Sequence, residues 1–278
     1  MTIDIKKNIA TITDLEEYSL ALTLDCGQAF RWEQIDDNSF SGVLRGKSFI
    51  LTQPDDTTLI ISPCDEKDAN LVLDYFDFSR SYSDIKSQIC SDEIIKKAVD
   101  FAGGIRILKQ EEWEALASFI LSQNNNIKRI KGIVKSLCEN FGERLSSGAY
   151  TFPSYEVIAK LTPDDLAPIR SGFRAKYLID GAKKVASGEV SFEYLKTAPI
   201  DSAREHLKQI KGVGDKVAEC VLLYGLNRLD AFPIDVWIKR ALDEGYSGGM
   251  PQIPSEYMGV AQQYIFHYIR TKGKLKDL

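Results

Sequence analysis

This sequence predicts an α+β fold, in which an N-terminal antiparallel β-sheet domain packs on a two-lobed all-helical domain. Short apolar runs separated by turn residues fill the chain before Asp68. From about Asp68 onward the apolar residues recur at helical spacing, and no repeat or low-complexity linker interrupts them. We therefore expect a sheet domain over residues 1–100 and a helical domain over residues 101–278, with a helix-hairpin-helix near residues 203–226.

Four short runs in the first domain have the composition of β-strands, and turn residues separate them. The predicted strands are Phe30–Gln34, Ser41–Leu44, Ser48–Thr52 and Thr58–Ile61, and the turns are Asp36–Asn38, Arg45–Lys47 and Pro54–Asp56. Strands joined by such short turns pair antiparallel, so these runs predict one antiparallel meander.

The second domain is predicted to consist of many short helices. Ser91 is expected to cap a helix that ends at Gly103-Gly104, and Thr162 is expected to cap one with Pro163 at its first position. The other predicted helices are Glu111–Ser122, Ile127–Phe141, Arg174–Ser187, Ala203–Ile210, Lys216–Leu226, Val236–Leu242 and Ser255–Tyr268.

Composition indicates a globular intracellular protein. The chain has 278 residues, 44% of them apolar, which is enough for one large or two ordinary cores. No apolar run approaches a membrane span, and residues 1–7 lack a signal-peptide core, so we expect a cytoplasmic location, or a nuclear one in a eukaryote. Five scattered cysteines without a C-x-x-C pair favour reduced thiols, and only two histidines argue against a histidine-bound metal.

The net charge of −5 is unevenly distributed along the chain. Residues 1–100 hold 10 Lys and Arg against 19 Asp and Glu, whereas the remaining residues hold 25 against 21. The basic surplus therefore belongs to the predicted helical domain, where it favours an acidic partner or is an ordinary solvated surface.

Residues 207–220, Leu-Lys-Gln-Ile-Lys-Gly-Val-Gly-Asp-Lys-Val-Ala-Glu-Cys, predict two helices joined by a glycine turn. Gly212 and Gly214 permit a sharp turn and leave backbone N–H groups at the start of the second helix free to bind a phosphate. Glycines also occur in plain turns between helices, so the pair by itself leaves both interpretations open.

Lys216 and Asp235 are the candidate catalytic groups. Lys216 lies in the first turn of its predicted helix, a position that disfavours a positive charge, and nucleophilic attack requires the neutral amine. Asp235 follows Pro233 and precedes an apolar helix, which makes it a good N-cap. Taken singly, each residue also has a structural interpretation, as a solvated lysine and as a cap.

In this order, the glycine hairpin, Lys216 and Pro233-Ile234-Asp235-Val236 resemble the helix-hairpin-helix Gly/Pro-Asp signature of base-excision DNA glycosylases. The resemblance implies that Lys216 attacks C1′ of a damaged nucleotide and that Asp235 assists. Family members with a lysine at this position also cut the DNA strand.

Two further segments resemble the 8-oxoguanine DNA glycosylases, in a match that covers residues 22–266. Residues 24–32, Leu-Asp-Cys-Gly-Gln-Ala-Phe-Arg-Trp, match the segment whose glycine carbonyl accepts the N7–H of the oxidised base, a role that falls on Gly27. Residues 257–266 resemble the helix that contributes a glutamine to the base edge and a phenylalanine to its face, here Gln262 and Phe266. Cys220 corresponds to a cysteine that packs on the other face.

The resemblance also assigns residues to the gap left by the extruded base and to the opposite strand. Residues 122–130, Ser-Gln-Asn-Asn-Asn-Ile-Lys-Arg-Ile, place Asn124 in the gap and Arg129 at the orphaned cytosine. Phe173 and Arg174 match an aromatic-Arg pair beside the opposite base, although the family often has Tyr in place of Phe173. Trp237 stands where eukaryotic members have a phosphate-contacting His, so that contact is not transferred.

The resemblance implies a bifunctional enzyme that excises 8-oxoguanine from duplex DNA and then nicks the strand. We expect no cofactor, no catalytic metal and a monomer whose partner is duplex DNA containing the lesion. Two alternatives remain at this point: an alkylpurine DNA glycosylase of the same fold, and a noncatalytic helix-hairpin-helix DNA-binding protein. The first does not use a covalent lysine, and the second needs neither Lys216 nor Asp235.

Overall fold

The structure is a computed structural model that describes residues 1–275. Its strands are β1 Thr2–Lys6, β2 Ile9–Thr13, β3 Glu33–Asp36, β4 Ser39–Leu44, β5 Lys47–Asp55 and β6 Thr58–Ser62. They form one antiparallel sheet in the order β1-β2-β6-β5-β4-β3. The predicted meander is therefore confirmed as β3 to β6, and an N-terminal hairpin extends it at the β6 edge.

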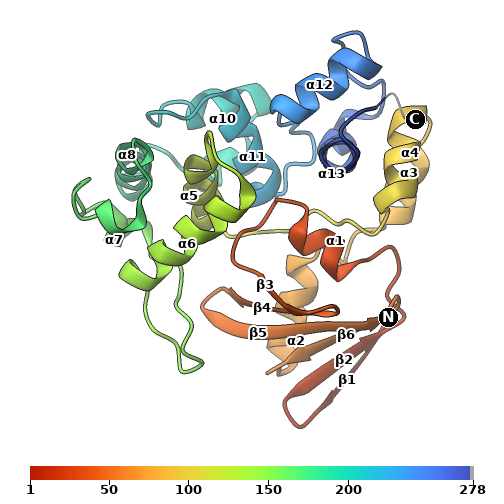
Figure 1. Ribbon diagram of the computed structural model, residues 1–278, viewed down its shortest axis with the longest axis horizontal. Coiled ribbons are helices and arrows are strands. Elements are labelled where there is room, and N and C mark those ends of the chain that lie inside the picture. The colour runs from red at the N-terminus through yellow and green to blue at the C-terminus, as the bar shows by residue number, and fades with distance from the viewer. Residues whose placement is uncertain (276–278) are drawn as a thin grey trace.

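The α-helices, in chain order, are α1 Leu20–Asp25, α2 Glu66–Tyr75, α3 Tyr82–Ile89, α4 Glu93–Ala102, α5 Glu112–Ser122, α6 Ile127–Phe141, α7 Tyr155–Ile158, α8 Arg174–Ala186, α9 Phe192–Thr197, α10 Ile200–Leu207, α11 Asp215–Leu226, α12 Val236–Gly245 and α13 Met258–Lys272. Two 3₁₀ turns, η1 Ala167–Ile169 and η2 Ser255–Tyr257, complete the helical part. In Figure 1 the sheet lies below most of the helices, with α5, α6, α7 and α8 to the left of α11 and α3, α4, α12 and α13 to its right.

The first predicted strand, Phe30–Gln34, begins three residues before the observed strand β3. β3 begins at Glu33, whereas Phe30 and Trp32 are buried in the preceding irregular segment. Gln28 holds that segment inside the protein, because its side chain donates to the carbonyls of Thr23 and Arg106. These tertiary contacts override the strand-like alternation.

Two predicted helix starts also differ. Asp92, rather than Ser91, caps α4, since its carboxylate accepts from the N–H groups of Ile94 and Ile95. Thr162 does exchange cap-like hydrogen bonds with Asp165, yet a turn follows instead of a helix. Pro168 lies where a continuing helix would need an N–H group, which stops propagation.

Two hydrophobic cores fill the molecule. One is formed mainly by the sheet and α2 and includes Trp32, Phe49 and Phe76, and the other lies among the remaining helices. The buried residues of α3 and α4, from Tyr82 onward, belong to the helical core. The change from one core to the other along the chain therefore lies before residue 100. No helix within residues 1–275 is long and apolar enough to cross a membrane.

Candidate active site

The predicted hairpin joins α10 to α11 and is supported from α8. Gly212 has a φ of 77°, and a Cβ built there would lie 2.2 Å from Cδ2 of Tyr177. Asp180 accepts a hydrogen bond of 2.8 Å from the backbone N–H of Lys211. Because both supporting side chains come from α8, that helix fixes the conformation of the hairpin.

Gly214 is the N-cap of α11 and differs from Gly212. Its φ of −104° and ψ of −174° suit any residue, and no heavy atom of the described chain lies within 4 Å of its Cβ position. No side chain caps this helix start within residues 1–275. The fold does not require glycine here. A ligand that approaches the N–H groups of the first turn would require it, because a side chain would obstruct the approach.

Lys216 is the second residue of α11 and is partly buried beside aromatic and thiol groups. Its Nζ lies 5.4 Å from the ring centroid of Phe119, which stacks on Tyr224 at a centroid distance of 5.2 Å. Cys220, one turn further along α11, is 3% exposed. The amine therefore lies beside the Phe119 ring, on the side of α11 that also carries Cys220.

Burial raises the pKa of the Cys220 thiol to about 11, against the opposing charge of Lys216 and with a smaller contribution from the Asp235 carboxylate. The thiol is therefore neutral at pH 7. The pKa of the Cys220 thiol thus responds to the charges of two groups, Lys216 on the same helix and Asp235 from a later segment.

Asp235 is the N-cap of α12. Its Oδ1 accepts from the backbone N–H groups of Trp237 at 3.0 Å and Ile238 at 2.8 Å. The cap fixes the orientation of the partly buried carboxylate at the start of α12.

Gln262 and its neighbour Gln263 connect α13 to the rest of the site. Gln262 is 3% exposed and donates from Nε2 to the Pro233 carbonyl at 3.0 Å. The Tyr224 hydroxyl bonds to Gln263 Oε1 at 2.5 Å, and Gln263 Nε2 donates to the Cys26 carbonyl at 3.4 Å. The network joins α11, α13, the segment before Asp235 and the Cys26-Gly27 turn.

Gly27 has a φ of 93° and lies close to α13. A Cβ there would lie 2.9 Å from Cδ1 of Ile127, 3.2 Å from Nη1 of Arg270 and 3.5 Å from Cε1 of Phe266. The turn thus brings the Gly27 backbone, from the sheet side, against the partly buried Phe266 ring. Only glycine satisfies both the positive φ and this close packing.

Asn124, Arg129, Phe173 and Arg174 lie together on another surface. Asn124 is exposed with a φ of 50°, and Phe173 is 49% exposed. Arg174 is 6% exposed and donates from Nε to the Gln123 carbonyl at 2.6 Å and from Nη2 to the Asn124 carbonyl at 3.2 Å. Arg174 therefore supports the turn that carries Asn124.

The guanidinium of Arg174 also lies 4.5 Å from the centroid of the Phe173 ring. Burial, together with the charge of Arg129, lowers the pKa of Arg174 below its ordinary value. Arg129 itself is exposed and donates to the Arg170 carbonyl at 3.3 Å. Of the two arginines, Arg129 presents the more accessible cation.

The sequence interpretation missed Phe119, Tyr224 and Gln263. Tyr224 lies four residues after Cys220 and eight after Lys216, so helical periodicity could have placed all three on one face of α11. Phe119 comes from α5, which packs against α11. No local signal in the sequence identifies that contact.

All five cysteines are free thiols. Within residues 1–275, no group of three or more His, Cys, Asp or Glu side chains is arranged to hold a metal ion.

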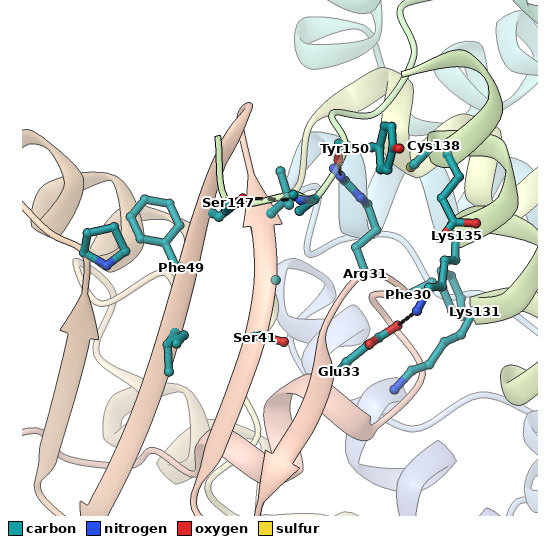
Figure 2. A pocket seen from close by; sticks show the side chains of 18 residues that line it. Phe30, Arg31, Glu33, Ser41, Phe49, Lys131, Lys135, Cys138, Ser147 and Tyr150 are labelled. Atoms are coloured by element: carbon teal, nitrogen blue, oxygen red, sulfur yellow. Dashed lines mark hydrogen bonds and ion pairs between the residues drawn. The ribbon is translucent and has the colours of Figure 1, made fainter. Parts of the chain in front are cut away.

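A separate cavity of 540 Å³ lies between the sheet and α6. Figure 2 shows Phe49 and Ser41 on its sheet side and Lys135 on its helical side, where Lys135 pairs with Glu33 at 2.9 Å. None of its lining residues is among the predicted site residues. The cavity is therefore distinct from the surroundings of Lys216.

Comparisons with known proteins identify the family of the chain. Residues 11–116 match the family model of the 8-oxoguanine DNA glycosylase N-terminal domain. Residues 117–252 match that of the HhH-GPD superfamily base excision DNA repair proteins. Together these matches include both the sheet and the hairpin.

The N-glycosylase/DNA lyase of Saccharomyces cerevisiae is 35% identical over 83% of this chain and 69% of its own length. MBOgg1, solved with a low-affinity DNA ligand, has a TM-score of 0.91 at 38% identity, over 98% of this chain and 99% of its own. The Clostridium acetobutylicum 8-oxoguanine glycosylase/lyase, solved with duplex DNA containing cytosine opposite 8-oxoguanine, has a TM-score of 0.91 at 33% identity, over 99% of both chains. This chain therefore belongs to the 8-oxoguanine DNA glycosylase family, within the helix-hairpin-helix Gly/Pro-Asp superfamily.

Proposed function

We propose that this protein is a bifunctional DNA glycosylase and lyase, which excises 8-oxoguanine from duplex DNA and then nicks the strand. The observation that carries this proposal is the position of Lys216. It follows the hairpin directly on α11, lies beside the Phe119 ring, and precedes Cys220 by one helical turn. The Cys220 thiol responds to the charges of both Lys216 and Asp235. Membership of a family of glycosylase/lyases supports the same conclusion.

Excision requires the lesion to leave the base stack, so the protein must hold the backbone and fill the gap. The N–H groups that follow Gly212 and Gly214 bind a phosphate. Asn124 enters the gap, and Arg129, Phe173 and Arg174 lie beside the opposite base. Arg174 also holds the turn that carries Asn124. The partner is thus duplex DNA with the lesion, bound by a monomer.

The chemistry proceeds through the Lys216 amine. Its lone pair attacks C1′ of the flipped nucleotide, the bond from C1′ to N9 breaks, and the base departs with the bonding electrons. Loss of a proton from nitrogen and opening of the sugar give a Schiff base. Abstraction of a C2′ proton then expels the 3′ phosphate by β-elimination. Asp235 stabilises the positive charge that develops on the sugar, and no cofactor is needed.

The proposed pocket for the base is formed by Gly27, Cys220, Gln262 and Phe266. The Gly27 carbonyl accepts the N7–H of 8-oxoguanine, whereas guanine has a lone pair at N7 and leaves two acceptors facing each other. Phe266 and Cys220 contact the two faces of the base. The Gln262 amide hydrogen-bonds the Watson–Crick edge of the base. To do so, it gives up part of its present hydrogen bonding with the Pro233 carbonyl.

Borohydride trapping separates this proposal from its alternatives. Duplexes containing 8-oxoguanine opposite cytosine, an alkylated purine, or no lesion are incubated with the protein and sodium borohydride. We expect a covalent complex and free 8-oxoguanine only with the first duplex. Release of the alkylated purine without trapping would indicate an alkylpurine glycosylase, and binding without release a noncatalytic module. Since its substrate is DNA, we also propose that the protein acts inside the cell.

A further inference from the structure

Glu219 is a buried charged residue to which the proposed mechanism assigns no role. It lies on α11, three residues after Lys216 and directly before Cys220, and is 6% exposed. Neither the glycine hairpin nor the Pro-x-Asp signature includes it. A buried carboxylate is costly unless its oxygens are paired, so its partners indicate its role.

Both oxygens of Glu219 have partners, and the partners belong to different segments. Oε1 accepts from Nε of Arg204, on α10, at 2.5 Å. Oε2 accepts from the backbone N–H of Phe232 at 2.7 Å. Arg204 also pairs with Asp201 at 2.7 Å. One carboxylate therefore joins both helices of the hairpin motif to the segment that leads to Asp235.

That segment, residues 227–235, is irregular and is held at successive points. The N–H of Gly259 donates to the Leu229 carbonyl at 2.7 Å, and Gln262 donates to the Pro233 carbonyl at 3.0 Å. Both contacts come from α13. The contact of Glu219 with Phe232 comes instead from α11, the helix that carries Lys216. Glu219 thus connects the helix that carries Lys216 to the segment that leads to Asp235.

We propose that Glu219 is a positioning residue, which acts through Asp235 to align it with the sugar that Lys216 attacks. This inference rests on the proposed glycosylase function. Small displacements of reacting groups are costly, since about 1 Å can reduce a rate by about a hundredfold. Glu219→Gln keeps one acceptor but turns its amide donor toward either Arg204 or Phe232, so it disturbs one anchor without a large change in volume.

The test is single-turnover excision with active-site titration. We expect Glu219→Gln to lower the rate constant for 8-oxoguanine release by about tenfold to a hundredfold. The reactive fraction and the Kd for a duplex with a non-cleavable 8-oxoguanine nucleotide should stay near wild-type values. A purely structural role would lower the reactive fraction and leave the rate constant of the remaining molecules unchanged. Glu114→Gln is the matched control, because Glu114 forms a partly buried pair with Arg31 at 2.9 Å outside the site.

A double-mutant cycle identifies the residue through which Glu219 acts. If Glu219 positions Asp235, Glu219→Gln should have little further effect on the rate constant in an Asp235→Asn background. Full additivity, or a wild-type rate constant in the single variant, would overturn the inference. Glu219→Asp keeps the negative charge but shortens the side chain. If geometry is the cause, this variant should lower the rate constant as Glu219→Gln does. Absence of excision by the wild-type protein would instead contradict the proposed function.

Discussion

The Tyr177 ring lies directly against Gly212, so close that a Cβ on the glycine would lie 2.2 Å from it. Two residues further, Gly214 has open space around its Cβ position. The two glycines of the hairpin therefore serve different purposes. Gly212 is required by packing and by its positive φ, whereas neither packing nor backbone conformation requires Gly214.

Ala substitutions at the two positions should separate folding from DNA binding. Gly212→Ala should lower the free energy of unfolding by about 1 to 3 kcal/mol, because it strains the turn and displaces Tyr177. Gly214→Ala should leave stability within about 0.5 kcal/mol but weaken duplex binding with and without the lesion. Thermal unfolding and salt-titrated binding provide the measurements. Equal stability losses would contradict the distinction.

Lys216→Gln should abolish both base release and borohydride trapping while binding of the lesion duplex persists. The substitution removes the nucleophilic amine and retains a polar side chain of similar length beside Phe119. Trapping gels and binding titrations test this. Retained crosslinking would show that another amine is the nucleophile.

Asp235→Asn should lower the single-turnover rate by about a hundredfold or more with little change in affinity. Asn is as good an N-cap as Asp, so its Oδ1 can keep accepting from Trp237 and Ile238. The negative charge is lost, but the cap is not. A wild-type rate would show that Asp235 serves only as a helix cap. Asp235→Ala is the comparison for that role, because loss of the cap should lower the free energy of unfolding by about 1 kcal/mol.

Gly27→Ala should reduce 8-oxoguanine excision strongly and leave general duplex binding unchanged. The added methyl meets Ile127 at 2.9 Å and Arg270 at 3.2 Å and strains a residue with a φ of 93°. The carbonyl that we propose selects the lesion must then move. Because the hairpin is a separate segment, the salt dependence of nonspecific binding should hardly change. Wild-type excision would remove this carbonyl from the recognition mechanism.

Stability should fall as the pH rises from about 9 to about 11. Burial raises the pKa of the Cys220 thiol to about 11, whereas an unfolded thiol ionises near pH 9. In this window the unfolded state binds fewer protons than the native state, so the free energy of unfolding decreases by up to about 3 kcal/mol. Denaturant titrations across the window should show a shallower decline for Cys220→Ala. The partly exposed Cys90, as Cys90→Ala, should change the slope less.

Much of the fold is encoded in local patterns. The boundaries of α6 match the prediction at both ends, because its apolar spacing is flanked by Asn126 at the N-cap and Gly142 at the C-cap. The predicted start of the first meander strand and the predicted helix after Thr162 were wrong, since burial of the Gln28 side chain and the position of Pro168 overrode local preference. The pairing of β2 with β6 joins segments far apart in the chain, and no local signal predicts it.

The sequence by itself determined the chemical identity of the proposed site: a glycine hairpin, a lysine one residue into the next helix, and a capping aspartate. Short-range order along the chain suffices for these, because the hairpin and both helix starts are local structures. Only the tertiary structure decided what each group contacts. It placed Phe119 beside Lys216, turned Arg174 inward to hold Asn124, and joined Glu219 to the segment before Asp235. Those contacts depend on how distant helices pack around one core, which no spacing within a single segment specifies.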